Sequence, residues 1–195
     1  AQPYDYMLLD LGAGISSLVP AAFPERVRRI VLLEGAGPLS APTESAPSQL
    51  RAALDDEARA AYAAAKIFPD FEVAVTARLR DSDLNLEAAR LLVERGTEQV
   101  EGGVRFTHDP RLKPRSRLRF TEDQVRAFLA EIACPVLAVR ALQGWPFPAD
   151  VVAARLAVIR ELSTAEVEGG HHVHLTHPER VAPVIREFFS AVRRE

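Results

Sequence analysis

Two apolar runs near the start of the chain flank a segment with helical spacing. The pattern predicts strands at 4–10 and 28–34 with a helix at 11–23 between them. Each predicted strand ends on an acidic residue, Asp10 in the first and Glu34 in the second. Parallel strands joined by a right-handed helical crossover end at the same edge of a sheet. We therefore expect Asp10 and Glu34 to be near neighbours.

The middle of the chain has a different pattern. Gly, Pro, Ser and Ala dominate residues 35–48, which is typical of a long connection. Helix-forming residues then follow, without a strand pattern until a short alternating segment at 102–107. The helices predicted here lie at 47–66, 69–80 and 83–96. Three helices in succession favour a helical lid at 41–117, inserted into a core made of residues 1–40 and 118–195.

The last third of the chain returns to alternating helices and strands. Thr121 and Gln124 have the spacing of a capping box, which predicts a helix start. The elements predicted from there are a helix at 121–133, a strand at 135–141, a helix at 148–162, a strand at 163–168 and a helix at 178–194. Sequential strand-helix units of one hand add neighbour by neighbour, so we expect parallel strands in chain order. The expected fold class is α/β, a partial parallel sheet with flanking helices.

The composition is that of a globular protein with one sizeable core. The chain has 195 residues, of which 48% are hydrophobic, and a formal net charge of -3. This charge gives no basic field for nucleic acid, and no apolar stretch reaches the ~20 residues that span a bilayer. The single cysteine, Cys134, excludes an intrachain disulfide. We expect a cytoplasmic protein that binds neither nucleic acid nor membranes.

The small-residue turn after Asp10 allows two interpretations. The sequence LDLGAG at 9–14 resembles the glycine-rich first motif of class I methyltransferases, in which an acid such as Glu34 would hold the ribose of S-adenosylmethionine. It also resembles the nucleophile elbow of α/β-hydrolases, a strained strand-to-helix turn flanked by small residues. In that case Asp10 occupies the nucleophile position. The stretch by itself leaves both interpretations open.

The end of the chain adds a second resemblance. The sequence EGGHHVHLTHPERVAPVIREFF is similar to the histidine loop and last helix of α/β-hydrolases, with Gly170 and His171 after the final strand and Pro178 at the start of the closing helix. The stretches CPVLAVRALQGWPFP and RFTEDQVRAFLAEI resemble preceding segments of the serine-hydrolase-like branch of that superfamily. The order of these motifs implies an α/β-hydrolase fold from the elbow strand onward.

This resemblance implies a nucleophile, an acid and a histidine at the carboxyl ends of strands. Residues 141–144, where some family members carry the acid, contain no Asp or Glu, so the resemblance leaves Glu34 for that role. Asp10, Glu34 and His171 would then form a triad like that of haloalkane dehalogenases and epoxide hydrolases, which pass through an alkyl-enzyme ester. The backbone N–H of Leu11 is the expected oxyanion donor.

The resemblance implies hydrolysis of a small apolar ester or related substrate. The candidate pocket residues are His108 in the lid-exit stretch and Trp145 and Phe147 after the strand at 135–141. No cofactor is implied. The other histidines near His171, at positions 172, 174 and 177, have no companion cysteine or acid pair at ligand spacing, so no metal site is expected.

A simpler alternative is a non-catalytic or truncated member of the same family. Asp10 would then be a helix N-cap and Glu34 a solvated strand end. The sequence begins at the elbow strand, so the loop that gives the second oxyanion donor is not part of it. In that case one edge of the strand at 4–10 needs a partner, and we expect self-association or a partner chain along it.

Overall fold

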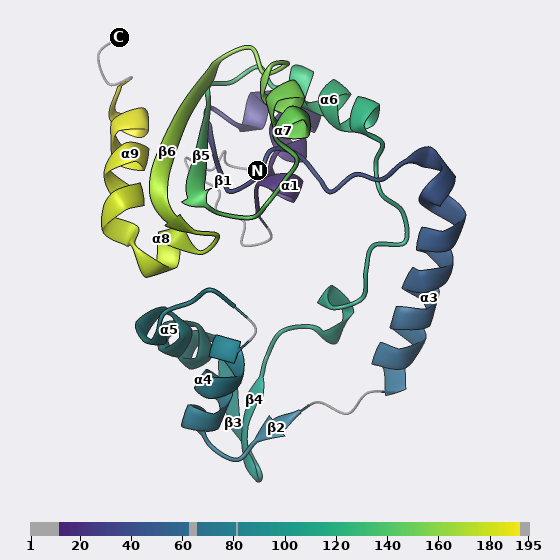
Figure 1. The fold of residues 1–195 in the computed structure, drawn as a ribbon, viewed down its shortest axis with the longest axis vertical. Helices are drawn as coiled ribbons and strands as arrows, with labels where there is room; N and C mark the ends of the chain where they lie inside the picture. Colours follow the sequence, from purple (N-terminus) through teal and green to yellow (C-terminus); the bar gives the residue numbers. More distant parts are fainter. Residues whose placement is uncertain (1–11, 63–65, 81, 192–195) are drawn as a thin grey trace. The chain divides into compact units, whose positions relative to one another are not determined.

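The computed structural model describes residues 12–62, 66–80 and 82–191 (Figure 1). These residues form two compact units, which we describe separately. The first unit contains residues 12–43 and 119–191, and the second contains residues 44–118. Asp10, Leu11 and the predicted strand at 4–10 lie outside the described residues, so their placement stays a prediction.

The first unit is built on a parallel sheet. Its strands are β1 (Ile30–Leu33), β5 (Val136–Gln143) and β6 (Leu162–Gly170), and their spatial order is β1-β5-β6. Ile30 pairs with Val136 in the β1–β5 ladder, and Val136 pairs in turn with Leu162 of β6. For these strands the expected parallel arrangement in chain order is confirmed. All three therefore end at the same edge of the sheet.

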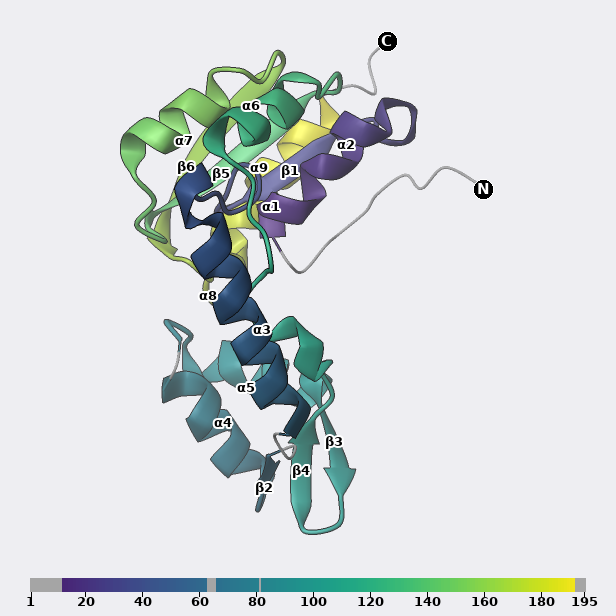
Figure 2. The same ribbon diagram turned by 90° about the vertical axis from the view of Figure 1, so that its right-hand side faces the viewer.

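Helices cover both faces of this sheet (Figures 1 and 2). On one face lie α2 (Leu18–Ala22), α6 (Glu122–Ala130) and α7 (Ala149–Leu156), and on the other lie α8 (Val173–Thr176) and α9 (Pro178–Ser190). Strand side chains alternate between the faces. Leu32 and Val136 pack with Leu129 of α6, whereas Val139 packs with Val181 of α9. The α/β fold class predicted from the pattern is confirmed.

The predicted helix at 11–23 is divided into two short helices. The first, α1, covers Gly12–Ser16, and α2 follows after Ser17. Pro20 accounts for the division, because in one continuous helix its ring would clash with the carbonyl of residue 16 and it has no N–H to donate. The hydroxyl of Ser17 is fully buried and donates to the carbonyl of Gly14 (2.7 Å). A short turn, η1 (Pro24–Arg26), then leads into β1.

The predicted capping box at the start of α6 is present. The N–H of Gln124 donates to Oγ1 of Thr121 (3.3 Å), and the N–H of Thr121 donates to Oε1 of Gln124 (2.9 Å). Just before this cap, Phe120 pairs with Ser40 in an isolated parallel bridge. The chain therefore leaves the first unit and returns to it along adjacent backbone.

The second unit contains more strand than the sequence pattern predicted. A short turn, η2 (Thr43–Ser45), lies at the boundary between the units, and the helical elements that follow are α3 (Ala46–Tyr62), α4 (Phe71–Arg80), α5 (Leu86–Gly96) and η3 (Pro110–Leu112). Beside them lies an antiparallel sheet of β2 (Ile67–Phe68), β4 (Gly103–Phe106) and β3 (Thr97–Val100), in that order. Figure 2 shows β3 and β4 as a hairpin. Only β4 was expected, because β2 has two residues and the sequence TEQV of β3 is largely polar. The role of this unit as a lid stays a prediction.

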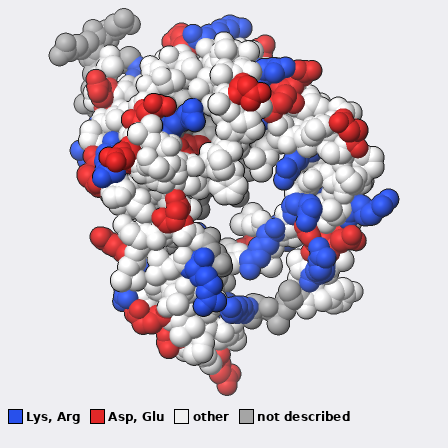
Figure 3. Space-filling model, viewed as in Figure 1, with Lys and Arg blue, Asp and Glu red and all other residues white. Residues whose placement is uncertain are grey.

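Several charged side chains in the second unit form ion pairs. Asp56 of α3 binds Arg115 (2.6 Å), and Glu57 of the same helix binds Arg117 (2.8 Å). Two guanidinium groups neighbour Asp56, with that of Arg115 contributing most, and they lower the pKa of its carboxyl to about 2. Figure 3 shows basic and acidic side chains close together in several places on one face. Within the described ranges, no helix combines the length and apolar character needed to cross a bilayer.

Candidate functional site

Glu34 follows the last residue of β1 and turns the chain away from the sheet. Its backbone has φ 56°, in the left-handed region that residues with a side chain rarely adopt. Its N–H still donates to the carbonyl of Val139 (2.9 Å), which extends the β1–β5 ladder by one step. The side chain is only 8% exposed. The alternative prediction of a solvated strand end is therefore wrong, because this carboxylate is buried.

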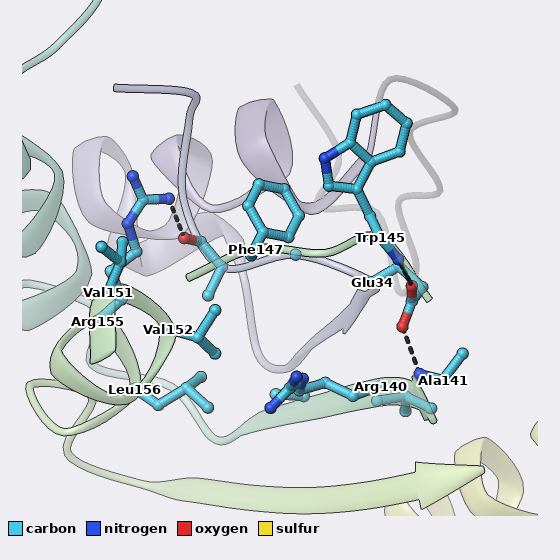
Figure 4. A pocket seen from close by; sticks show the side chains of 13 residues that line it. Glu34, Arg140, Ala141, Trp145, Phe147, Val151, Val152, Arg155 and Leu156 are labelled. Carbon is cyan, nitrogen blue, oxygen red and sulfur yellow. Dashed lines mark hydrogen bonds between the residues drawn. The ribbon is translucent and has the colours of Figure 1, made fainter. Parts of the chain in front are cut away.

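Backbone N–H groups at the end of β5 hold the Glu34 carboxylate. Oε1 accepts a hydrogen bond from Ala141, and Oε2 accepts one from Trp145 (3.2 Å; Figure 4). Buried acceptors require such partners. Gly144 makes the approach possible, since a Cβ at that position would lie 2.0 Å from Oε2 of Glu34. The Glu34 carboxylate thus occupies the space that the Cβ of any other residue at position 144 would need.

His171 follows the last residue of β6 and meets this carboxylate. Its Nδ1 lies 3.4 Å from Oε2 of Glu34. The distance is at the long end for a hydrogen bond. The His171 ring lies edge-on to Trp145, with the centroids 5.7 Å apart. In the tautomer with a proton on Nδ1, His171 donates to Glu34 and its Nε2 remains free to accept a proton.

The structure therefore brings two of the three predicted triad residues together. Asp10 and Leu11 lie outside the described residues, and their roles as nucleophile and oxyanion donor stay predictions. Gly14 follows these two residues in the same turn, and its surroundings are described by the structure. A Cβ on it would lie 3.3 Å from the carbonyl oxygen of Gly37, so α1 passes close to the loop that begins at Glu34.

Trp145 and Phe147, two predicted pocket residues, line a small cavity beside Glu34 (Figure 4). Its volume is about 40 Å³, and its remaining walls come from the loop after β1, the end of β5, and the apolar side of α7. Because one water needs about 10–15 Å³, the cavity has room for ordered water or a small alkyl group. His108 belongs to the second unit, where its ring lies 5.9 Å from Phe106. Its assignment to the pocket stays a prediction.

Sequence reasoning missed residues that surround this site. The chief one is Arg155 of α7, whose guanidinium is buried against the loop after β1 and pairs with Glu122 (2.6 Å). The available signal was an arginine at an apolar-facing position in the sequence VVAARLAVI. Among the described residues, no three His, Cys, Asp or Glu side chains gather closely enough to hold a metal ion.

Comparisons with known proteins identify the family to which this fold belongs. A family model described as alpha/beta hydrolase fold matches residues 9–178. A probable serine hydrolase of Drosophila melanogaster is 30% identical over 91% of this chain, and a serine hydrolase-like protein of Danio rerio is 26% identical over 91%. The crystal structure of a hypothetical protein from Pseudomonas aeruginosa superposes with a TM-score of 0.82, at 33% identity over 94% of this chain.

The chain spans only part of each of these proteins. It covers 57% of the Drosophila relative, 58% of the Danio relative and 65% of the Pseudomonas structure. The similarity therefore concerns a portion of each relative, and the family model spans the positions of Glu34 and His171.

Proposed function

Because this chain belongs to the alpha/beta hydrolase fold family, we propose that it hydrolyses a small apolar ester or related molecule. Glu34 and His171 act as the acid and the histidine of a triad, and Asp10 occupies the nucleophile position. The observation that carries this proposal is the contact of 3.4 Å between His171 and the buried carboxylate of Glu34. Family membership also overturns the methyltransferase interpretation of residues 9–14, since the family match runs through that stretch.

The contacts of Glu34 define its role in this proposal. Two backbone N–H groups fix the carboxylate from one side, and His171 meets it at Oε2. This arrangement keeps the imidazole in one orientation, with the Nδ1 proton directed at the carboxylate. Nε2 then takes a proton from water as that water attacks the covalent intermediate. The positive charge that develops on the ring is stabilised by Glu34.

The cavity beside Glu34 supports a small apolar substrate group. Its walls include Phe147, Val152 and Leu156, together with Trp145, whose ring is edge-on to that of His171. Binding sites with mostly apolar walls and one or two polar groups hold compact organic molecules. A volume of about 40 Å³ suits a short alkyl group.

An ester assay with a matched pair of histidine variants tests this proposal. The probes are p-nitrophenyl acetate and p-nitrophenyl butyrate. His171→Ala is expected to lower kcat/KM by about 100-fold or more, because a positioned general base contributes about 10²–10⁴. His177→Ala is the control, since His177 pairs with Glu179 at the start of α9 (3.2 Å). Equal rates for wild type and His171→Ala, at the level of the buffer, would contradict the proposal.

A non-catalytic member of the family is the second candidate. The observation that favours it is the nucleophile position, where this chain has Asp10 although its relatives are named a probable serine hydrolase and a serine hydrolase-like protein. In that case Glu34 and His171 form a structural pair only. The same assay separates the two, because a non-catalytic chain gives no rate that depends on His171.

A further inference from the structure

Arg155 is a charged residue that is only 5% exposed. A guanidinium has five N–H groups, and here each has an acceptor. Nε donates to Glu122 (3.0 Å), and Nη2 donates to Glu122 (2.6 Å) and to the hydroxyl of Ser40 (3.0 Å). Nη1 donates to the carbonyls of Ala36 (2.8 Å, dashed in Figure 4) and Gly37 (3.4 Å). Arg155 thus binds one carboxylate and three points of a single loop.

That loop is the one that begins with Glu34. It runs from Glu34 to Ser40. The two carbonyls that Arg155 binds, those of Ala36 and Gly37, therefore lie two and three residues after the candidate acid. Gly37 has φ 80°, and a Cβ there would lie 2.5 Å from Cγ1 of Val125, which shows how closely the loop packs on α6. The hydroxyl of Ser40 also donates to Glu122. The loop is therefore held at both of its ends, by the sheet and by Arg155.

Glu122 compensates the buried charge of Arg155. Hydrogen bonds from the Arg155 guanidinium lower the pKa of the Glu122 carboxyl, with a smaller contribution from Ser40. Glu122 is consequently charged at neutral pH, and its two-point contact with Arg155 fixes the plane of the guanidinium. This fixed plane aims Nη1 at the loop carbonyls.

We propose that Arg155 is a positioning residue for the acid of the site, holding the loop at 34–40 so that the Glu34 carboxylate stays in contact with His171. Glu122 and Ser40 orient Arg155. The catalytic consequence rests on the proposed function, but the positioning does not. A lysine cannot replace Arg155, because three donors on one nitrogen cannot bind the carboxylate and the loop carbonyls together.

The test compares two variants of the 195-residue chain. Arg155→Lys keeps the charge and removes the planar fork. The double variant Arg155→Met, Glu122→Gln removes both charges, and replacing a buried ion pair as a whole often leaves stability unchanged. Arg126→Met is the control, because Arg126 lies on α6 and pairs with Asp123 near the surface. Glu34→Ala gives the reference for a histidine without its carboxylate.

Two measurements are made on variants whose circular dichroism matches the wild type. The ¹⁵N shifts of the His171 ring report whether Nδ1 carries the proton. In both Arg155 variants we expect the ¹⁵N shifts of the His171 ring to move toward those of Glu34→Ala. We also expect kcat for p-nitrophenyl acetate to fall at least about 10-fold with KM nearly unchanged. Wild-type ¹⁵N shifts in a folded double variant would overturn the inference. If the wild type has no esterase activity, the proposed function fails while the ¹⁵N shifts still decide the role of Arg155.

Discussion

Nδ1 of His171 lies 3.4 Å from Oε2 of Glu34, although 137 positions separate the two residues in the chain. Each is the first residue after a strand, Glu34 after β1 and His171 after β6. The two strands flank β5 (Figure 1). Both residues therefore lie at the same end of β5. This is why N–H groups at the end of β5 bind the Glu34 carboxylate. The geometry of the pair therefore depends on the loops that follow these strands.

Gly144→Ala is expected to displace the Glu34 carboxylate. The new Cβ would lie 2.0 Å from Oε2, and no left-handed φ at Gly144 adds backbone strain. A misplacement of about 1 Å can cost about 100-fold in rate, so we expect kcat for p-nitrophenyl acetate to fall by that order. Overpacking is expected to lower the free energy of unfolding by about 1–3 kcal/mol. Enzyme kinetics and urea unfolding measure the two effects.

The control for this variant is Gly96→Ala. A Cβ at Gly96 would meet only Cδ1 of Phe106, at an ordinary contact distance of 3.8 Å. The kcat of Gly96→Ala for p-nitrophenyl acetate should match that of the wild type. A normal rate in Gly144→Ala would show that the position of the carboxylate does not control the reaction.

Glu34→Gly is expected to be more stable than Glu34→Ala. Both variants lose the carboxylate and its contacts with the backbone and His171, but only alanine must keep a side chain at φ 56°. Relief of this strain is expected to favour the glycine variant by about 1 kcal/mol. Urea unfolding of the two variants gives the difference directly. Equal stabilities would mean that the backbone at residue 34 relaxes once the carboxylate is gone.

The sheet and the pair of residues on it could be predicted from sequence for a local reason. The strands β1 and β5 are compact apolar runs, and an acid closes β1, so their parallel order and the position of Glu34 follow from simple rules. The position of His171 came from its resemblance to a known histidine loop. These predictions needed only short stretches of sequence.

Features that depend on distant partners could not be predicted in this way. Arg155 is buried only because Glu122 and the carbonyl of Ala36 come together around it in the folded chain. The importance of Gly144 depends on a side chain 110 positions earlier, which no local pattern records. The strand β3 was not predicted because its sequence is largely polar, and it is held in the sheet by pairing with β4.

Acid is expected to weaken the attachment of α3 to the segment that contains Arg115. The pKa of Asp56 is lowered to about 2, chiefly by hydrogen bonds from Arg115 and then from Arg59. A folded pKa below the unfolded value of 3.8 contributes stability that is present above about pH 4 and is lost as the pH falls through about 2. The difference in unfolding free energy between wild type and Asp56→Asn should therefore shrink between pH 5 and pH 2.

Asp55→Asn is the matched control for this pH dependence. Asp55 is the preceding residue of α3 and is exposed, so the variant removes one charge without removing the contact with Arg115. Urea unfolding at pH 5, 4, 3 and 2 measures all three proteins. A difference between wild type and Asp56→Asn that stays constant over this range would show that the ion pair contributes nothing to stability.

An oxygen label can test whether Asp10 is the nucleophile. With 1-bromobutane as probe, a carboxylate oxygen of Asp10 forms a bond to carbon as bromide leaves, and water activated by His171 then attacks the carboxyl carbon of this ester. The attack releases butanol and leaves one water oxygen in Asp10. In H₂¹⁸O with the protein in excess over the probe, the peptide that contains Asp10 should gain about 2 Da, seen by mass spectrometry. His171→Ala should instead retain the butyl ester, a gain of about 56 Da on the same peptide.

Direct attack of water on the probe predicts the opposite distribution of the label. Bromide would still be released, but ¹⁸O would appear in butanol and the peptide with Asp10 would keep its mass. Asp10→Asn separates the two mechanisms further, because an amide in place of the carboxylate removes the nucleophile while leaving Glu34 and His171 in contact. Bromide release by Asp10→Asn at the wild-type rate would therefore exclude the covalent route and reduce Asp10 to its alternative role, the N-cap of the helix that follows it.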